Sequence, residues 1–134
     1  MTKISKNQTI DILGIGNAIV DIVIQVQDSI LEKYSLTKGS MTLVDEKKAN
    51  EIYSSLEIDC KLNKSGGSAA NTIAGISQLG LSTAFIGRVK DDELGKIFNK
   101  EISSVGTLFK TPAKNEGPST ARCIIFVTPD AERT

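Results

Sequence analysis

Residues 65–95 read SGGSAANTIAGISQLGLSTAFIGRVKDDELG, and most of the expected architecture follows from them. A pair of glycines breaks the chain, and the small residues from Ser68 to the glycine at position 80 predict a helix that can lie close to a sheet. A strand is expected at 83–89. A second helix is expected at 91–104, because acidic residues open it and apolar residues follow at helical spacing. Strands that alternate with helices predict an α/β protein with a partly parallel sheet.

The sequence on either side of this stretch adds further strands and helices. Residues 10–15 are β-branched and apolar, as in a buried strand, whereas 19–26 and 120–128 alternate in polarity, as in half-exposed strands. Asp45 is expected to be the N-cap of a helix, and 28–34 are expected to form a helical turn. The chain ends where the second arm of a hairpin would begin, so we expect the natural protein to continue.

Composition excludes several classes of function. The 134 residues include 16 basic and 16 acidic side chains and no histidine. A neutral total offers no attraction for nucleic acid or for an anionic membrane, so neither is an expected partner. Without histidine, a zinc site of His and Cys and the Ser-His-Asp and Cys-His catalytic units are missing, and no metal site is expected. The polar N-terminus and the short apolar runs predict a cytoplasmic protein.

The two cysteines, Cys60 and Cys123, are far apart in the sequence. We expect both to be reduced thiols packed as small apolar residues. Cys60 and Leu62 alternate with lysines, which predicts an edge strand.

A first polar cluster combines the turn Gly14-Ile15-Gly16-Asn17 with Asp21. A dinucleotide-binding fingerprint would need a third glycine that opens a helix, and Ile19 stands there instead. One interpretation is a tight turn with Asn17 in a left-handed conformation. The other is a ligand site, because a carboxylate among apolar neighbours is costly to bury without a partner, and a hydroxyl-rich ligand would supply one.

A second polar cluster lies at Gly66, Gly67 and Asn71. Two glycines let a backbone approach a ligand closely, and the start of a helix presents free N–H groups. No Gly-Lys-Ser/Thr follows, so this is not a phosphate-binding P-loop. The alternative is a plain junction between a loop and a helix, capped by Ser68.

Taken together, these segments resemble the N-terminal signature of the ribokinase (PfkB carbohydrate kinase) family, adenosine-kinase-like branch. The spacing from Asn71 to Gly80 also fits. The segments that carry the resemblance are residues 16–21, 65–72, 84–89, 91–95 and 128–134.

The resemblance implies a ribokinase-like sheet sandwiched by helices, with a small β lid over the acceptor site. Residues 1–134 would be the N-terminal part of one such domain, with lid strands near 19–26 and 119–134. The implied function is ATP-dependent phosphorylation of a hydroxymethyl group on a sugar or nucleoside, adenosine-like. The implied substrate-binding residues are Asn17 and Asp21 on the sugar hydroxyls, and Gly66, Gly67 and Asn71 on the other wall.

The fold is expected to be incomplete in this chain. In the family the catalytic base belongs to a Gly-Ala-Gly-Asp motif that would lie beyond Thr134, as would the ATP site. The chain would therefore give the acceptor-binding half and hold no catalytic residue. ATP and Mg²⁺ would serve the full-length enzyme, and neither is expected to bind this chain alone. Asp91 and Asp92 need no catalytic role, because acids at a helix start have a structural explanation.

Three departures and two alternatives accompany the resemblance. Ile73 replaces a small residue, Lys90 stands where a glycine is usual, and 106–117 are compressed. A non-catalytic sugar-binding, nucleoside-binding or assembly module is an alternative, since lid strands of the family can pair two copies into a homodimer. A dinucleotide-dependent oxidoreductase is a second alternative, against which the missing third glycine argues.

An incomplete sheet would also leave apolar surface without cover. The expected exposed groups are the stripe of Ile97, Phe98 and Ile102 and the face of Cys123, Ile125 and Val127.

Overall fold

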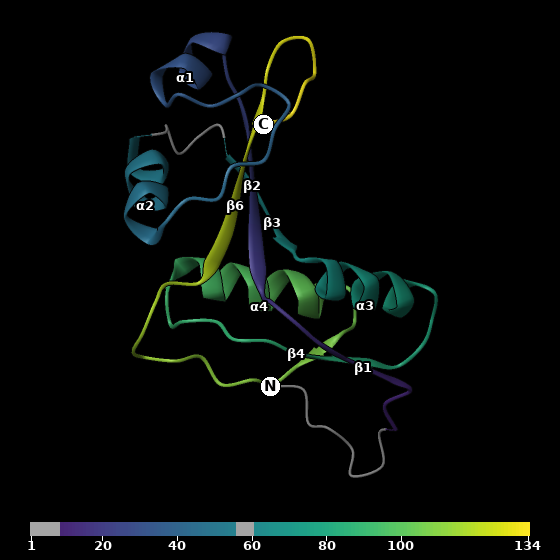
Figure 1. The fold of residues 1–134 in the computed structure, drawn as a ribbon. Helices are drawn as coiled ribbons and strands as arrows, with labels where there is room; N and C mark the ends of the chain where they lie inside the picture. Colours follow the sequence, from purple (N-terminus) through teal and green to yellow (C-terminus); the bar gives the residue numbers. More distant parts are fainter. Residues whose placement is uncertain (1–8, 56–60) are drawn as a thin grey trace.

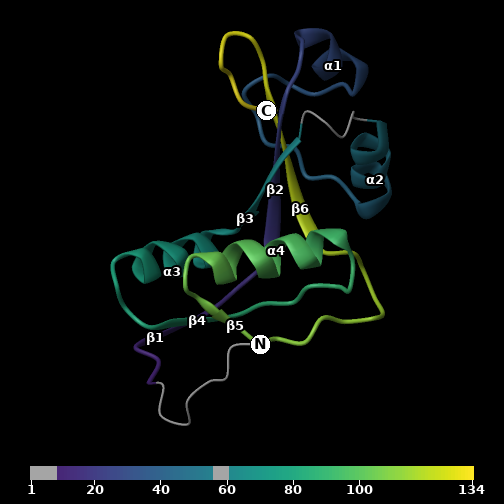
Figure 2. The same cartoon turned by 180° about the vertical axis from the view of Figure 1, so that it is seen from behind.

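The computed structural model describes residues 9–55 and 61–134, which form two small sheets with a pair of helices between them (Figures 1 and 2). One sheet lies below helices α3 and α4 in Figure 1, and the other stands above them. In chain order the elements are β1 (Ile12–Ile15), β2 (Ile19–Gln25), α1 (Asp28–Lys33), α2 (Glu46–Ser55), β3 (Lys61–Gly66), α3 (Ser68–Gln78), β4 (Thr83–Ile86), α4 (Glu93–Ser104), β5 (Leu108–Phe109) and β6 (Ala121–Val127).

The lower sheet is parallel, with strand order β1-β4-β5. Helix α3 can lie close to it because glycines face the helix. A Cβ atom on Gly14 would stand 2.3 Å from Cγ1 of Ile73, and one on Gly16 would stand 2.8 Å from Cβ of Ala69. The prediction of a small-residue helix close to a sheet is thus confirmed.

An aromatic cluster joins this sheet to α4. The ring centroids of Phe85 and Phe98 are 5.9 Å apart, and those of Phe98 and Phe109 are 5.3 Å apart. Phe98 and Ile102 are fully buried. The expectation that the apolar stripe of α4 would be exposed is therefore wrong, because β4 and β5 supply the aromatic side chains that cover it.

The upper sheet, which we call the lid, has strand order β3-β2-β6. Strand β2 is antiparallel to β3 and parallel to β6. Its two faces differ. Val20, Ile22 and Ile24 are buried in the core with Leu31 of α1, while the alternate positions of β2 are only partly buried. We call the face that carries these alternate positions the open face of the lid.

Helices cover only one face of the lower sheet in the described part of the chain (Figures 1 and 2). On the opposite face Leu13, Ile15 and Ile86 have exposed fractions of 54%, 71% and 44%. A parallel sheet normally has both faces covered, so this face lacks its usual layer of helices.

Most of the expected elements are present, with local differences. The strand expected at 83–89 ends at Ile86, and β5 was not expected. Gly67, with a φ of 98°, precedes α3 at the N-cap position that Ser68 was expected to hold. The expected edge strand is β3, while Cys60 lies outside the described residues.

The replacement of a glycine by Lys90 does not strain the backbone. Among the described non-glycine residues, positive φ values occur only at Ser35 and Ala131. The turn before α4 therefore needs no left-handed residue at position 90.

Candidate functional site

Asp21 lies at the centre of the lid, on its open face. It pairs in register with Lys64 of β3 and Cys123 of β6. Paired residues of neighbouring strands share a face, so a carboxylate, an ammonium group and a thiol occupy one side of the lid.

Gly66 forms the surface against which the Asp21 carboxylate rests. A Cβ atom on Gly66 would stand 2.4 Å from Oδ2 and 2.6 Å from Oδ1 of Asp21. Any other residue would push the carboxylate away, because real Cβ atoms do not approach oxygen this closely. The close approach explains one glycine of the Gly-Gly pair.

The Asp21 carboxylate has no protein partner in residues 9–55 and 61–134. It accepts no hydrogen bond and forms no ion pair within 4 Å there. Partial burial raises the pKa of Asp21 above its ordinary value of 3.8. A half-buried carboxylate without donors is costly, and the hydroxyl groups of a ligand would offset that cost.

Gly67 brings the start of α3 against the connection between β1 and β2. With its φ of 98°, a Cβ atom there would stand 2.6 Å from the carbonyl oxygen of Asn17. Asn17 itself is not in the left-handed region, so the interpretation of Asn17 as a left-handed turn residue is wrong. Its side chain is exposed and makes no hydrogen bond within the described residues.

Asn71 lies one turn into α3 and is linked to this group through its backbone. Its N–H donates to the carbonyl of Gly67 at 2.8 Å, and its side chain is exposed. Four predicted residues, Asn17, Asp21, Gly66 and Gly67, thus pack in two contacting pairs, and Asn71 is attached to the second pair.

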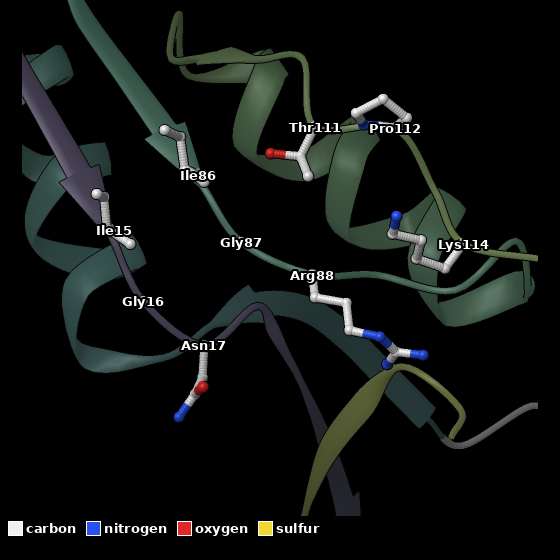
Figure 3. Close-up of a pocket in the computed structure, with 9 residues that line it drawn as sticks. All are labelled: Ile15, Gly16, Asn17, Ile86, Gly87, Arg88, Thr111, Pro112 and Lys114. Carbon is white, nitrogen blue, oxygen red and sulfur yellow. The ribbon is translucent and has the colours of Figure 1, made fainter. Parts of the chain in front are cut away.

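A cleft of about 440 Å³ lies beside this group, beyond the carboxyl ends of the parallel strands (Figure 3). That edge is where open α/β sheets bind ligands. Asn17 lines the cleft, whereas the other four predicted residues do not. Figure 3 shows the side chains of Asn17 and Arg88 extending toward the strands of the lid. The remaining lining residues are Ile15, Gly16, Ile86, Gly87, Thr111, Pro112 and Lys114.

Arg88 and Lys114 were not singled out from the sequence. Arg88 donates to the carbonyl oxygens of Glu116 and Pro118 at 3.2 and 2.8 Å, so it holds the loop that leads back to the lid. A signal for Arg88 was present, because it lies inside the motif at 84–89. Lys114 lies in an irregular loop, where no periodicity marks it.

Cys123 is exposed, so the expectation that it packs as a small apolar residue is wrong. Its strand alternates, and position 123 falls on the open face, opposite Asp21. The residue as a whole is exposed, but neighbouring groups still cover part of the sulfur, and this burial and the negative charge of Asp21 both raise the pKa of the thiol. The thiol is thus protonated at neutral pH and stands beside the carboxylate.

In residues 9–55 and 61–134, no group of three histidine, cysteine, aspartate or glutamate side chains could hold a metal ion. No helix in that part of the chain is long and apolar enough to cross a membrane.

Comparison with known proteins identifies relatives along most of the chain. Residues 36–134 match the family described as pfkB family carbohydrate kinase. The chain is 45% identical to the adenosine kinase of Sinorhizobium meliloti and 44% identical to a probable sugar kinase of Rhizobium etli CFN 42, each with a TM-score of 0.77. Both matches cover 92% of this chain and 37% of the other. The adenosine kinase of Trypanosoma brucei brucei, 20% identical with a TM-score of 0.78, shares the fold.

A shorter match connects the chain to a sugar-acid kinase. The 5-dehydro-2-deoxygluconokinase of Geobacillus kaustophilus (strain HTA426) is 41% identical over 59 residues, which are 43% of this chain and 18% of that protein. The chain therefore spans well under half the length of the proteins it matches. The expected fold class, a ribokinase-like sheet with a small β lid, is confirmed over that length.

Proposed function

Because the chain belongs to the pfkB carbohydrate kinase family, we propose that it forms the acceptor-binding side of an ATP-dependent kinase. The acceptor is a hydroxymethyl group on a sugar or nucleoside. The γ-phosphoryl group passes from ATP to the hydroxymethyl oxygen, ADP leaves, and the hydroxyl proton goes to a base that we assign to no residue of this chain. In such a reaction a protein mainly positions the groups and stabilises charge.

The unpaired carboxylate of Asp21 is the observation that carries the proposal. When ionised, it accepts hydrogen bonds from neighbouring hydroxyls of a ribose or sugar ring, and such charge-assisted bonds are among the stronger ones. Gly66 and Gly67 serve the site indirectly, because without side chains they let the Asp21 carboxylate and the Asn17 carbonyl pack against the start of α3. The backbones of Asn17 and Asn71 both contact Gly67, and we assign their exposed side-chain amides to further hydroxyls of the acceptor.

Among acceptors, an adenosine-like nucleoside fits better than an open-chain sugar acid. Val23 and Ile125 pair in register and extend the open face of the lid as an apolar surface next to Asp21. A flat nucleobase can cover apolar surface of this kind, whereas a sugar acid would place hydroxyls and a carboxylate on it. The 45% identity to an adenosine kinase points the same way.

ATP and Mg²⁺ belong to the proposal as donor and metal ion of the complete kinase. Among the described residues, no group of three histidine, cysteine, aspartate or glutamate side chains is available to hold the metal ion. The cytoplasmic location expected from the sequence is likewise part of the proposal.

The acceptor assignment is tested by titrating adenosine, and separately ribose, into the ¹⁵N-labelled chain. We expect amide shifts at Asp21, Gly66, Gly67 and Cys123, and we expect adenosine to slow alkylation of the Cys123 thiol by iodoacetamide. Asp21→Asn should abolish both effects. Asp91→Asn removes an exposed carboxylate outside the site and is the matched control.

Two results would contradict the acceptor assignment. One is the absence of shifts at all four residues with either ligand, and the other is binding that Asp21→Asn leaves intact. The non-catalytic alternative is tested separately in the full-length protein. A protein that binds adenosine at these residues but forms no ADP from ATP in its presence would be a binding module rather than a kinase.

A further inference from the structure

No short turn connects β2 to β6, so no turn fixes the register between them. In a hairpin the turn fixes the pairing of two strands, but β2 and β6 are parallel and stand at opposite ends of the chain. Their register nevertheless places Cys123 beside Asp21 and Ile125 beside Val23. The buried side chains of the two strands favour this register, and a contact at the start of β6 can add to them by fixing the position at which β6 enters the lid.

Asp92 contacts the residue that precedes β6. Its Oδ2 accepts the backbone N–H of Thr120 at 2.9 Å, and its Oδ1 accepts the hydroxyl of Thr120 at 2.7 Å. The same Oδ1 accepts the N–H of Gly95 at 2.8 Å, which caps α4. One carboxylate thus joins the start of α4 to the start of β6, over 28 residues of sequence.

The surroundings of Asp92 are built for this contact. Thr120 is almost completely buried, and its Oγ1 also accepts the backbone N–H of Lys90 at 2.9 Å. A Cβ atom on Gly95 would stand 2.1 Å from the carbonyl oxygen of Lys90 and 3.1 Å from Oγ1 of Thr120. Only glycine at position 95 lets the three segments meet.

The pKa of Asp92 is consistent with an ionised carboxylate in this contact. Burial alone would raise the pKa of the Asp92 carboxyl, but the hydrogen bonds from Thr120 and Gly95 outweigh burial, and the pKa lies below its ordinary value. Asp92 is therefore charged at neutral pH, and its hydrogen bonds to Thr120 have the strength of charge-assisted ones.

We propose that Asp92 is a positioning residue that sets the register of β6 against β2 by holding both the amide and the hydroxyl of Thr120. A slip of one residue would turn each β6 side chain to the other face of the lid. Ile124 would then replace Cys123 beside Asp21. Asp92, at the start of α4, thus determines which side chains of β6 lie on the open face of the lid. The importance of Asp92 for acceptor binding rests on the proposed function, but its effect on the register of β6 does not.

Asp92→Ser separates this role from helix capping. Serine caps helices as well as aspartate, so the N–H of Gly95 keeps an acceptor, but a serine hydroxyl cannot hold both groups of Thr120 as well. The measurement is residue-resolved amide hydrogen exchange on the chain. We expect the amides of Thr120 and of β6 to exchange about tenfold faster or more, because Thr120 loses its hydrogen bonds to a charged group. The exchange rates of the amides of α4 and β4 should be unchanged.

Two further variants complete the experiment. Thr120→Val removes only the hydroxyl and should give a smaller acceleration in β6, and it serves where Asp92→Ser does not fold. Asp91→Ser changes the neighbouring acid, whose carboxylate forms an ion pair with Lys96 at 3.6 Å and no hydrogen bond to Thr120, and should leave β6 unchanged. The proposal is overturned if Asp92→Ser and Thr120→Val both leave exchange in β6 unaltered. It is equally overturned if exchange accelerates to the same extent in α4, β4 and β6, since that result would show a purely global loss of stability.

Discussion

The carboxylate of Asp21 lies half-buried on the lid, without a donor among the described residues, and its pKa is raised by burial. A group of this kind lowers the stability of the protein that holds it. Residues retained at a cost to stability are typical of binding sites, where a ligand supplies the missing partners.

We therefore predict that Asp21→Asn raises the free energy of unfolding at pH 7. The sign follows from the raised pKa. Above its ordinary value of 3.8, charging Asp21 costs the folded state more than the unfolded state, and the cost is relieved as the pH falls and the group is protonated in both. The variant and the parent chain should converge in stability below pH 3.8. Urea titrations at pH 7 and pH 3 measure both values, and an Asn variant that is less stable at pH 7 would contradict the prediction.

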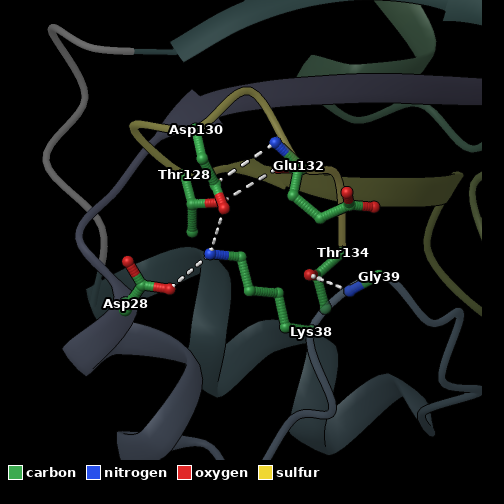
Figure 4. Close-up of polar contacts among 7 residues, drawn as sticks. All are labelled: Asp28, Lys38, Gly39, Thr128, Asp130, Glu132 and Thr134. Atoms are coloured by element: carbon green, nitrogen blue, oxygen red, sulfur yellow. Dashed lines mark hydrogen bonds and ion pairs between the residues drawn. The ribbon is translucent and has the colours of Figure 1, made fainter.

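Lys38, in the segment after α1, forms ion pairs with Asp28 and with Asp130 in the turn that follows β6 (Figure 4). Its Nζ stands 2.7 Å from Oδ1 of Asp28 and 2.7 Å from Oδ2 of Asp130. Hydrogen bonds from Lys38 and Thr128 lower the pKa of Asp130 to about 2. The stability that this pair contributes is present above the ordinary pKa and is lost as the pH falls toward 2.

Lys38→Met should return the pKa of Asp130 toward 3.8, because the largest cause of its shift is removed. A ¹³C NMR titration of the Asp130 carboxyl between pH 1 and pH 6 measures the change. Lys48→Met is the matched control, since Lys48 pairs with Glu51 at 3.1 Å and does not contact Asp130. An Asp130 midpoint that stays near 2 in Lys38→Met would show that Thr128 alone is sufficient.

Single residues show how far sequence could predict the site. Asp21 was found because a carboxylate inside an apolar strand is unusual whatever the fold. For Cys123 the sequence supported two conflicting expectations: the general preference of cysteine for the interior was wrong, whereas the alternation of its own strand, which puts Cys123 on an uncovered face, was right. Asn17 was left open between a turn and a ligand site, and only backbone angles could exclude the left-handed turn.

At the scale of the element, replacing a glycine by alanine in α3 and in α4 should change the free energy of unfolding in opposite directions. A Cβ atom on Gly75 of α3 would meet nothing within 4 Å, whereas one on Gly95 of α4 would meet the carbonyl of Lys90 at 2.1 Å. We expect Gly75→Ala to raise the free energy of unfolding by about 0.5–1 kcal/mol, the ordinary gain inside a helix. Gly95→Ala should lower it by about 1–3 kcal/mol or more, because backbone must move.

Thermal unfolding of the two variants, followed by circular dichroism, measures this pair. Each variant serves as the control for the other, because both make the same chemical change in a helix. A Gly95→Ala chain as stable as the parent would mean that the backbone at Lys90 can shift freely. The close packing around Asp92 would then not depend on glycine at position 95.

Elements with a clear period were predictable, and contacts between distant elements were not. The helices and the alternating strands β2 and β6 follow from apolar spacing. Strand β5 has two residues, too few to show a period, and only its pairing with β4 defines it. Asp92 was correctly assigned to the start of a helix, but nothing local could show that the same carboxylate reaches Thr120.

At the scale of the whole molecule, one of the two apolar surfaces expected to be exposed is covered, whereas Cys123 on the other, the lid face, is exposed. The stripe of α4 is covered by aromatic side chains from β4 and β5. A further open area is the uncovered face of the lower sheet, where β1 and β4 present Ile15 and Ile86 to solvent. In a sandwiched sheet a second layer of helices would cover this face.

We predict that the 134-residue chain binds a hydrophobic dye on this face, self-associates and transfers no phosphate from ATP to adenosine or ribose. Dye binding should fall in the double variant Ile15→Lys, Ile86→Lys, because charges replace apolar side chains that are 71% and 44% exposed. Leu79→Lys is the matched control, since Leu79 is 84% exposed but caps the end of α3 and belongs to no strand of the lower sheet. Dye fluorescence, light scattering and an ADP-release assay measure the three properties. Equal loss of dye binding in Leu79→Lys would place the dye elsewhere, and phosphate transfer by the chain alone would show that 134 residues suffice for catalysis.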